Sequence, residues 1–237
     1  MRPFHRLVWP LLAVLISVAA CTPTAAAATP PTIRVLPLGD SITAGLGSTT
    51  GAGYRLPLWN RVAGQSRYRV DYVGSLQAGT VPDRDHEGHR GWKIGEIRAQ
   101  IDSWLATAQP RYVILHIGIN DLAWGADPNA AAGQFADLVA RIYTDRPGVI
   151  IIVMGLIPTS AGLQQQVAAY NARIRTVPGP RYLDAPALTP GEMVDELHPN
   201  DAGYQRIGDA LYTDLTRMEI ARQRAGNQPP ATRIPRG

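Results

Sequence analysis

Cysteine and lysine are almost missing from this 237-residue chain, and each scarcity excludes a kind of protein. Cys21 is the only cysteine, so no disulfide can form within the chain. Lys93 is the only lysine and follows Trp92, so the chain has no phosphate-binding loop of the ATPase type. Residues 45–50 begin like a dinucleotide-binding fingerprint but end in Thr50, where the third glycine is needed. We therefore expect no nucleotide cofactor, and we expect residues 45–50 to form a flexible rim beside Ser41.

A strong charge of either sign is also lacking. The formal net charge is +4 at pH 7. It falls to +2 if the first 20 residues are removed as a signal peptide, because that segment holds two arginines and no acid. Such a charge is too small for a nucleic-acid-binding protein. Arginines gather instead near the C-terminus, where Gln228-Pro229-Pro230 is typical of a disordered end, so we expect residues 223–237 to be a disordered basic tail.

An apolar run at the N-terminus is too short to favour a membrane span. It covers residues 7–20 and follows Arg2 and Arg6, which predicts a secretion signal over residues 1–20. Val18-Ala19-Ala20-Cys21 resembles a bacterial lipobox, so we expect cleavage before Cys21 and a lipid anchor on it, which would be the chain's only membrane contact. Ordinary cleavage within residues 25–28 is the alternative. Either route places the protein outside the cytoplasm, extracellular or at the cell surface.

Residues 21–31 are rich in proline, alanine and threonine, which predicts a spacer. One domain is expected to follow over residues 32–222. Its apolar periodicity predicts strands alternating with helices, and such alternation favours a parallel sheet covered by helices on both faces. The expected strands are 33–38, 68–73, 112–117, 149–156 and 181–183. The expected helices are 56–63, 94–106, 130–143, 163–175 and 202–218.

Ser41 lies in a sharp turn directly after the first expected strand, in Leu38-Gly39-Asp40-Ser41. A serine hydroxyl is a poor nucleophile unless a base takes its proton and a third group orients that base. Asp195 precedes His198 by three positions, a spacing at which a carboxylate can bond the Nδ1 proton of its own histidine. We therefore interpret Ser41, Asp195 and His198 as nucleophile, orienting acid and general base. Thr43 stands where a nucleophile elbow has its second glycine, which argues against an ordinary α/β-hydrolase.

An acyl-transfer site also needs donors for a developing negative charge. Asn120 follows an expected strand, and ligands of parallel sheets sit at the carboxyl ends of strands. Gly91 would let its backbone N–H approach closely, because glycine has no Cβ. The N–H of Ser41, at the first turn of a helix, is the third candidate. We expect these three donors to form an oxyanion hole.

Plainer interpretations exist for each residue. Asp40 or Ser41 can cap a helix, as can Asn200, and the segment after Asn120 can be a turn. Residues 83–89 concentrate groups that can bind metals, but His86-Glu87-Gly88-His89 has one residue too few for a zinc-protease motif. We expect residues 83–89 to be a solvated or substrate-facing loop, and His116 to be a hydrogen-bonded core residue.

Four blocks in this order resemble the SGNH or GDSL hydrolase family: Gly39-Asp40-Ser41, Gly91, Gly118-Ile119-Asn120-Asp121 and Asp195-Glu196-Leu197-His198. Further segments, including Gly53-Tyr54-Arg55 and Asp85-His86-Glu87-Gly88-His89-Arg90-Gly91-Trp92, look like the acetylxylan-esterase-like carbohydrate esterases of family three. Arg90 and Ile119 depart from that branch, where a small polar residue and a threonine are expected.

This resemblance implies a three-layer α/β/α sandwich of flavodoxin-like SGNH type around a mostly parallel, five-stranded sheet. It implies Ser41, Gly91, Asn120 and His198 as the family's four named residues, with Asp195 as the acid. The implied activity is hydrolysis of short acyl esters, most often acetyl, on a carbohydrate, with no cofactor or metal. Two alternatives stay open: a lysophospholipase or thioesterase acting on longer acyl chains, and a non-catalytic glycan-binding lipoprotein.

Overall fold

The structure, a computed structural model, describes residues 29–158 and 162–226. The expected signal peptide, Cys21 and residues 227–237 of the expected tail lie outside the described residues. Within the described part of the chain, no helix is long and apolar enough to cross a membrane.

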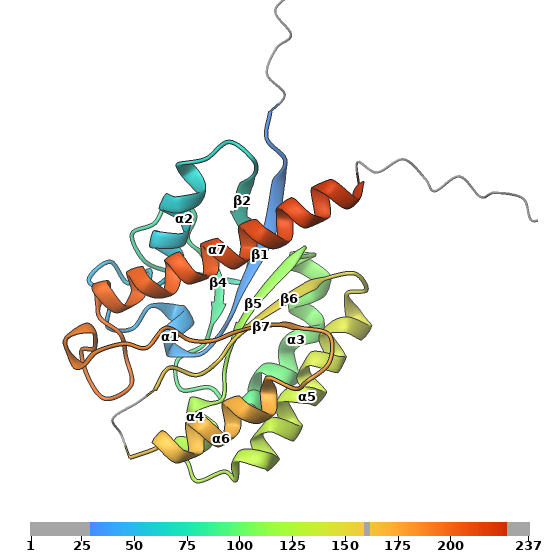
Figure 1. Cartoon of the computed structure of the whole chain (residues 1–237). Coiled ribbons are helices and arrows are strands. Elements are labelled where there is room, and N and C mark those ends of the chain that lie inside the picture. Colours follow the sequence, from blue (N-terminus) through green and yellow to red (C-terminus); the bar gives the residue numbers. More distant parts are fainter. Residues whose placement is uncertain (1–28, 159–161, 227–237) are drawn as a thin grey trace, which may run out of the picture.

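A seven-stranded sheet forms the centre of the domain (Figure 1). The strands are β1 (Thr32–Gly39), β2 (Arg69–Tyr72), β3 (Leu76–Gln77), β4 (Asp85–Gly88), β5 (Tyr112–His116), β6 (Ile150–Met154) and β7 (Arg181–Leu183). Their order is β3-β4-β1-β5-β6-β7, and β2 pairs with the first half of β1. All pairings are parallel except β3 with β4. The buried apolar runs of β1, β5 and β6 make the middle of the sheet, as strands covered on both faces require.

Helices cover both faces, which completes three layers. The helices are α1 (Ser41–Ala44), α2 (Arg55–Ala63), α3 (Ile94–Ala108), α4 (Ile119–Ala123), α5 (Pro128–Asp145), α6 (Gln164–Ile174) and α7 (Asp201–Gly226), with a 3₁₀ turn η1 (Pro190–Glu192). On one face α2 and α7 pack together over a core that includes Leu58, Ile207 and Leu211. On the other, α3, α5 and α6 pack side by side over a core that includes Ile97, Phe135 and Tyr170. Figure 1 shows these two helical layers on opposite sides of the strands.

The ends of three central strands lie level with one another, and this register positions the site. Gly39, the last residue of β1, pairs with Gly88 at the end of β4 and with His116 at the end of β5. Ser41, Gly91 and Asn120 follow these ends by two, three and four residues. Their segments therefore leave the sheet at one point of its carboxyl edge, where ligands of parallel sheets bind.

The sequence predicted the layers and the strands β1, β2, β5, β6 and β7, but the expected number of strands was wrong. β3 and β4 are additional, and β4 makes residues 85–88 a strand instead of the expected loop. Its residues, Asp-His-Glu-Gly, carry no apolar run, although His86 and Glu87 are fully buried. Helix α7 continues to Gly226, four residues beyond the expected end of the domain at residue 222.

Candidate active site

Ser41 is presented by a tight strand-to-helix turn at the end of β1. Gly39 is needed there because a Cβ on it would lie 2.0 Å from the carbonyl oxygen of His116 on the neighbouring strand. Asp40 is the N-cap of α1, and its Oδ1 accepts the N–H of Ile42 at 3.0 Å. Asp40 therefore caps the helix as the plainer interpretation predicted, and the same turn presents the Ser41 hydroxyl. Ser41 itself is 7% exposed.

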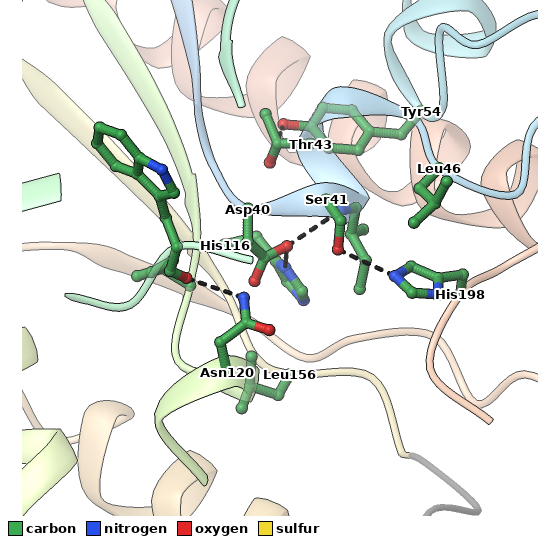
Figure 2. A network of polar contacts seen from close by, with 12 residues as sticks. Asp40, Ser41, Thr43, Leu46, Tyr54, His116, Asn120, Leu156 and His198 are labelled. Carbon is green, nitrogen blue, oxygen red and sulfur yellow. Dashed lines mark hydrogen bonds and ion pairs between the residues drawn. The ribbon is translucent and has the colours of Figure 1, made fainter. Parts of the chain in front are cut away.

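The structure brings Ser41, His198 and Asp195 into one hydrogen-bonded chain. Ser41 Oγ lies 3.0 Å from His198 Nε2, and Figure 2 shows the two side chains pointing at each other. His198 Nδ1 lies 2.8 Å and 3.0 Å from the two carboxylate oxygens of Asp195. When Nδ1–H donates to Asp195, Nε2 is left as an acceptor for the Ser41 hydroxyl. This is the geometry that a nucleophile, its base and an orienting acid require.

The segment 193–199 holds the acid and the base through local contacts. The N–H of Val194 donates to the carbonyl of His198 at 2.9 Å, and Met193 pairs with Pro199 as an antiparallel bridge. Inside this closed loop Asp195 Oδ1 accepts the backbone N–H groups of Leu197 and His198 at 2.8 and 2.7 Å. Partial burial raises the pKa of Asp195, but hydrogen bonds from the His198 ring and these two N–H groups outweigh it and lower the pKa below its ordinary value. Asp195 is thus an ionised partner for His198.

Asn120 is the second residue of α4, and its side chain points from that helix toward the turn that holds Ser41 (Figure 2). Its Nδ2 donates to the carbonyl of Trp92 at 2.8 Å. An amide group has two N–H donors, so this bond fixes the plane of the side chain and leaves the second donor for a ligand. The geometry suits an oxyanion donor, and that role stays a prediction.

Gly91 lies in an exposed turn after β4, in which the N–H of Trp92 donates to the carbonyl of His89 at 3.2 Å. Its φ of +78° belongs to the third residue of a turn that favours glycine. A Cβ at Gly91 would meet nothing within 4 Å. The backbone conformation therefore favours glycine here, and the expected close approach of its N–H to a substrate oxygen stays a prediction. Its role as an oxyanion donor stays a prediction.

A buried pair of ionisable groups lies behind the Ser41 turn. Asp40 and His116 are both fully buried, with His116 Nδ1 4.0 Å from Asp40 Oδ1. Burial raises the pKa of Asp40 to about 7 and lowers that of His116 to about 4. His116 was expected to be a hydrogen-bonded core residue. It is in the core, but among the described residues neither of its ring nitrogens has a hydrogen-bond partner.

The acidic and histidine residues of 83–89 point in different directions. His86 is buried with its Nδ1 accepting the N–H of Gly88 at 3.0 Å, and burial lowers its pKa to about 3. Asp83 instead accepts the N–H of Tyr72, and Glu87 binds Ser75 and His89. Across residues 29–158 and 162–226, no group of three histidine, cysteine or acidic side chains is arranged to hold a metal ion.

Two positions that depart from the expected sequence pattern lie differently. Arg90 is exposed beside Gly91, whereas Ile119 is 5% exposed and packs into the core. Any contact of Ile119 with a ligand is therefore indirect. The role of Trp92, whose carbonyl orients Asn120, was not predicted, because no residue pattern identifies a backbone acceptor.

Comparison with known proteins decides the family. The model of the GDSL-like lipase/acylhydrolase family matches residues 38–206, a range that includes Ser41, Gly91, Asn120 and His198. The chain belongs to this family. It is an ester-hydrolysing enzyme of the GDSL type, and its three-layer α/β architecture is the fold of its relatives.

Several relatives are carbohydrate or acetyl esterases. A family 3 carbohydrate esterase of Clostridium thermocellum is 30% identical, with a TM-score of 0.72 over 80% of this chain and 98% of that one. An acetyl esterase variant solved with an acetate ion is 26% identical, with a TM-score of 0.68 over 80% and 99% of the two chains. A multidomain esterase of Ruminococcus flavefaciens is 25% identical over 214 residues. That match covers 75% of this chain but only 28% of the relative's length.

Proposed function

We propose that this GDSL hydrolase is an exported serine esterase that removes short acyl groups, chiefly acetyl, from a carbohydrate. The observation that carries the proposal is the hydrogen-bonded chain from Ser41 Oγ through His198 to Asp195. A surface that only binds a glycan has no need of an aligned nucleophile, base and acid. The 30% identical family 3 carbohydrate esterase and the acetyl esterase support a sugar acetate as the substrate class.

In the proposed mechanism, Ser41 Oγ attacks the acyl carbon while its proton passes to His198 Nε2. The resulting tetrahedral intermediate collapses when His198 gives that proton to the departing sugar oxygen, which leaves the acyl group on Ser41. Water then attacks the acyl-enzyme, again losing its proton to His198, and the acid is released as the proton returns to Ser41. Asp195 stays ionised and stabilises the imidazolium form of His198.

The negative charge of each intermediate would form at the edge where the segments after β1, β4 and β5 meet. The N–H groups of Ser41 and Gly91 and the amide of Asn120 are the proposed donors. Because Trp92 already fixes the Asn120 amide, this donor needs no reorganisation during the reaction.

An exposed indole beside the site supports a sugar as the leaving group. Trp124 is 76% exposed and follows Asn120 by one helical turn, and its backbone N–H donates to the Asn120 carbonyl at 3.1 Å. The Lys93 ammonium lies 5.0 Å from the centre of its ring. An indole face is an apolar platform that a sugar ring can cover. We expect Trp124→Ala to raise KM several-fold for an acetylated oligosaccharide and to leave KM for p-nitrophenyl acetate unchanged, whereas equal KM values for both substrates would remove Trp124 from the substrate site.

The proposal is tested by measuring acid release from p-nitrophenyl esters of increasing acyl length, with the wild-type protein and Ser41→Ala side by side. Preference for acetate that is lost in the variant supports a deacetylase. Preference for long chains would instead favour a lipid acyl hydrolase. No turnover, together with no labelling by a serine-directed phosphonate, would favour a glycan-binding protein without activity.

Export is part of the same proposal. The arginines and apolar run of residues 1–20 and the lipobox-like Val18-Ala19-Ala20-Cys21 support it, with Cys21 as the proposed lipid attachment site. Mass analysis of the mature N-terminus in the native host distinguishes a lipidated Cys21 from cleavage within residues 25–28.

A further inference from the structure

His89 stacks against two indoles beside the candidate oxyanion hole. Its ring lies 4.1 Å from the Trp92 ring and 4.8 Å from the Trp104 ring, between centroids, with interplanar angles of 22° and 12°. Trp92 comes from the turn after β4, and Trp104 comes from the middle of α3. Stacked ring pairs at such distances stabilise each other beyond the area that they bury. The stack therefore ties the turn that contains Gly91 to a long, packed helix.

A buried carboxylate fixes the other edge of the His89 ring. His89 Nε2 lies 2.9 Å from Glu87 Oε1, and the Glu87 side chain is 1% exposed. Glu87 also accepts the N–H and the hydroxyl of Ser75, at 2.8 and 2.6 Å. A buried carboxylate held by three donors is costly to move, because any lost donor leaves part of its charge unpaired. His89 is therefore held in one position and orientation.

The backbone of the same turn connects His89 to both candidate donors. The N–H of His89 donates to the carbonyl of Gly39, the residue that precedes the Asp40-Ser41 turn, at 2.9 Å. Gly91 lies between His89 and Trp92 in the turn, and the Trp92 carbonyl accepts the Asn120 amide at 2.8 Å. The directions of the Gly91 N–H and of the free Asn120 donor thus both depend on where the Trp92 residue is held.

We propose that His89 is a positioning residue for the oxyanion hole. It acts through Trp92, which it holds by stacking, while Glu87 and Trp104 hold His89. This inference rests on the proposed function. Glu87 and His89 then contribute to transition-state stabilisation by positioning other groups, without touching the substrate. Since one oxyanion donor is worth about 10²–10³-fold in turnover, and a misplacement of about 1 Å costs up to about 10²-fold, we expect loss of His89 to lower kcat by about 10–10²-fold.

The test compares His89→Ala and His89→Phe with the wild type on p-nitrophenyl acetate, a substrate too small to reach distant subsites. His89→Phe keeps an aromatic ring against the indoles and is the second variant if alanine disturbs folding. We expect kcat to fall by about 10–10²-fold in His89→Ala with KM within about twofold, and His89→Phe to recover part of kcat. Trp59→Ala is the matched control, because it removes an aromatic side chain that pairs with Tyr72 under the opposite helical layer, 5.9 Å between centroids. It is expected to lower the melting temperature without lowering kcat.

A double variant separates positioning from a general structural effect. If His89 acts through the oxyanion hole, then its loss matters little once the Asn120 donor is gone, so His89→Ala in an Asn120→Ala background is expected to cost less than about threefold. A full, multiplicative loss in that background would overturn the inference. An unchanged kcat in folded His89→Ala would also overturn it, as would a kcat in His89→Phe no higher than in His89→Ala, or a rise in KM alone. If the wild type itself does not hydrolyse the ester, the proposed function has failed, and the inference fails with it.

Discussion

Ser41 and His198 meet at 3.0 Å, but the two regions that hold them are built in contrasting ways. Ser41 stands at the level ends of β1, β4 and β5, with Asp40, Glu87 and His116 fully buried behind and beside it. His198 belongs to the loop 193–199, which is closed by its own backbone contacts and leaves the Asp195 side chain 56% exposed.

The contrast indicates which contacts each half of the site depends on. The Ser41 region is set by pairings between residues far apart in sequence, so it forms only with the sheet. In the His198 region, hydrogen bonds within seven residues orient the acid and the base toward each other. We therefore expect changes in the Ser41 region to have larger consequences than comparable changes at the exposed acid.

The largest effect is expected where the two regions touch. Ser41→Ala removes the nucleophile and His198→Ala removes its base, and each is expected to lower kcat by about 10⁴–10⁶-fold. Because neither side chain is part of the packed core, melting temperatures are expected to stay close to that of the wild type. Turnover of p-nitrophenyl acetate and thermal unfolding measure both quantities. Retention of more than a tenth of the activity in either variant would show that the removed side chain is not the nucleophile or its base.

Loss of the Asn120 amide tests the buried half alone. Asn120→Ala is expected to reduce kcat by about 10²–10³-fold with little change in KM, because the lost hydrogen bond is made to charge that exists only in the transition state. Asn120→Asp is the matched variant, since its carboxylate cannot donate to Trp92 and repels an oxyanion, and it is expected to be at least as impaired. An active Asn120→Asp enzyme would remove this residue from the oxyanion hole.

Substitution of Asp195 tests the exposed half. A buried triad acid is worth about 10⁴-fold in turnover. Asp195 is half exposed, and water can partly solvate the imidazolium in its absence, so Asp195→Asn is expected to cost about 10²-fold or less. Its kcat is measured beside that of Asn120→Ala. A loss larger than that of Asn120→Ala would contradict the view that the solvent-exposed half is the more tolerant one.

The effect with the clearest pH dependence is expected at the buried pair Asp40 and His116, and it is an effect on stability. With pKa values of about 7 and about 4, the folded protein between pH 4 and 6.5 keeps one proton on Asp40 and leaves His116 neutral. In the unfolded chain, with ordinary pKa values of 3.8 and 6.5, the proton is on His116 and Asp40 is ionised. Both states hold one proton, so this pair gives the free energy of unfolding almost no pH dependence in that range.

Single substitutions at this pair are expected to expose two opposite slopes. Asp40→Asn leaves the lowered pKa of His116, so stability is expected to be lost as the pH falls from 6.5 toward 4. His116→Leu leaves the raised pKa of Asp40, so stability is expected to be lost as the pH rises from 4 toward 7. The pKa shifts set upper bounds of about 3 kcal/mol for the change that depends on His116 and about 4 kcal/mol for the one that depends on Asp40. Urea unfolding at several pH values measures both, and slopes of the same sign in the two variants would refute the assignment.

The sequence allowed the framework to be predicted where local patterns decide the structure. The apolar runs of β1, β5 and β6 predicted their strands, and the three-residue spacing of Asp195 and His198 predicted their contact. β4 was not predicted because its buried residues include charged and polar side chains. Partners such as Ser75 and His89, which only the fold brings near, compensate for the burial of Glu87. The positive φ of Gly91, +78°, was not predicted for a similar reason, because it is a property of the turn and not of the spacing.

The most direct test of this account is to label the wild-type protein with a serine-directed phosphonate and to map the modified peptide by mass spectrometry. A phosphonate bonds to an activated serine and places its oxygen where an oxyanion would form, so it requires both halves of the site together. The account predicts one label per chain, on Ser41, that is absent in Ser41→Ala and strongly slowed in His198→Ala and Asn120→Ala. No label, or a label on another serine that survives Ser41→Ala, would contradict it.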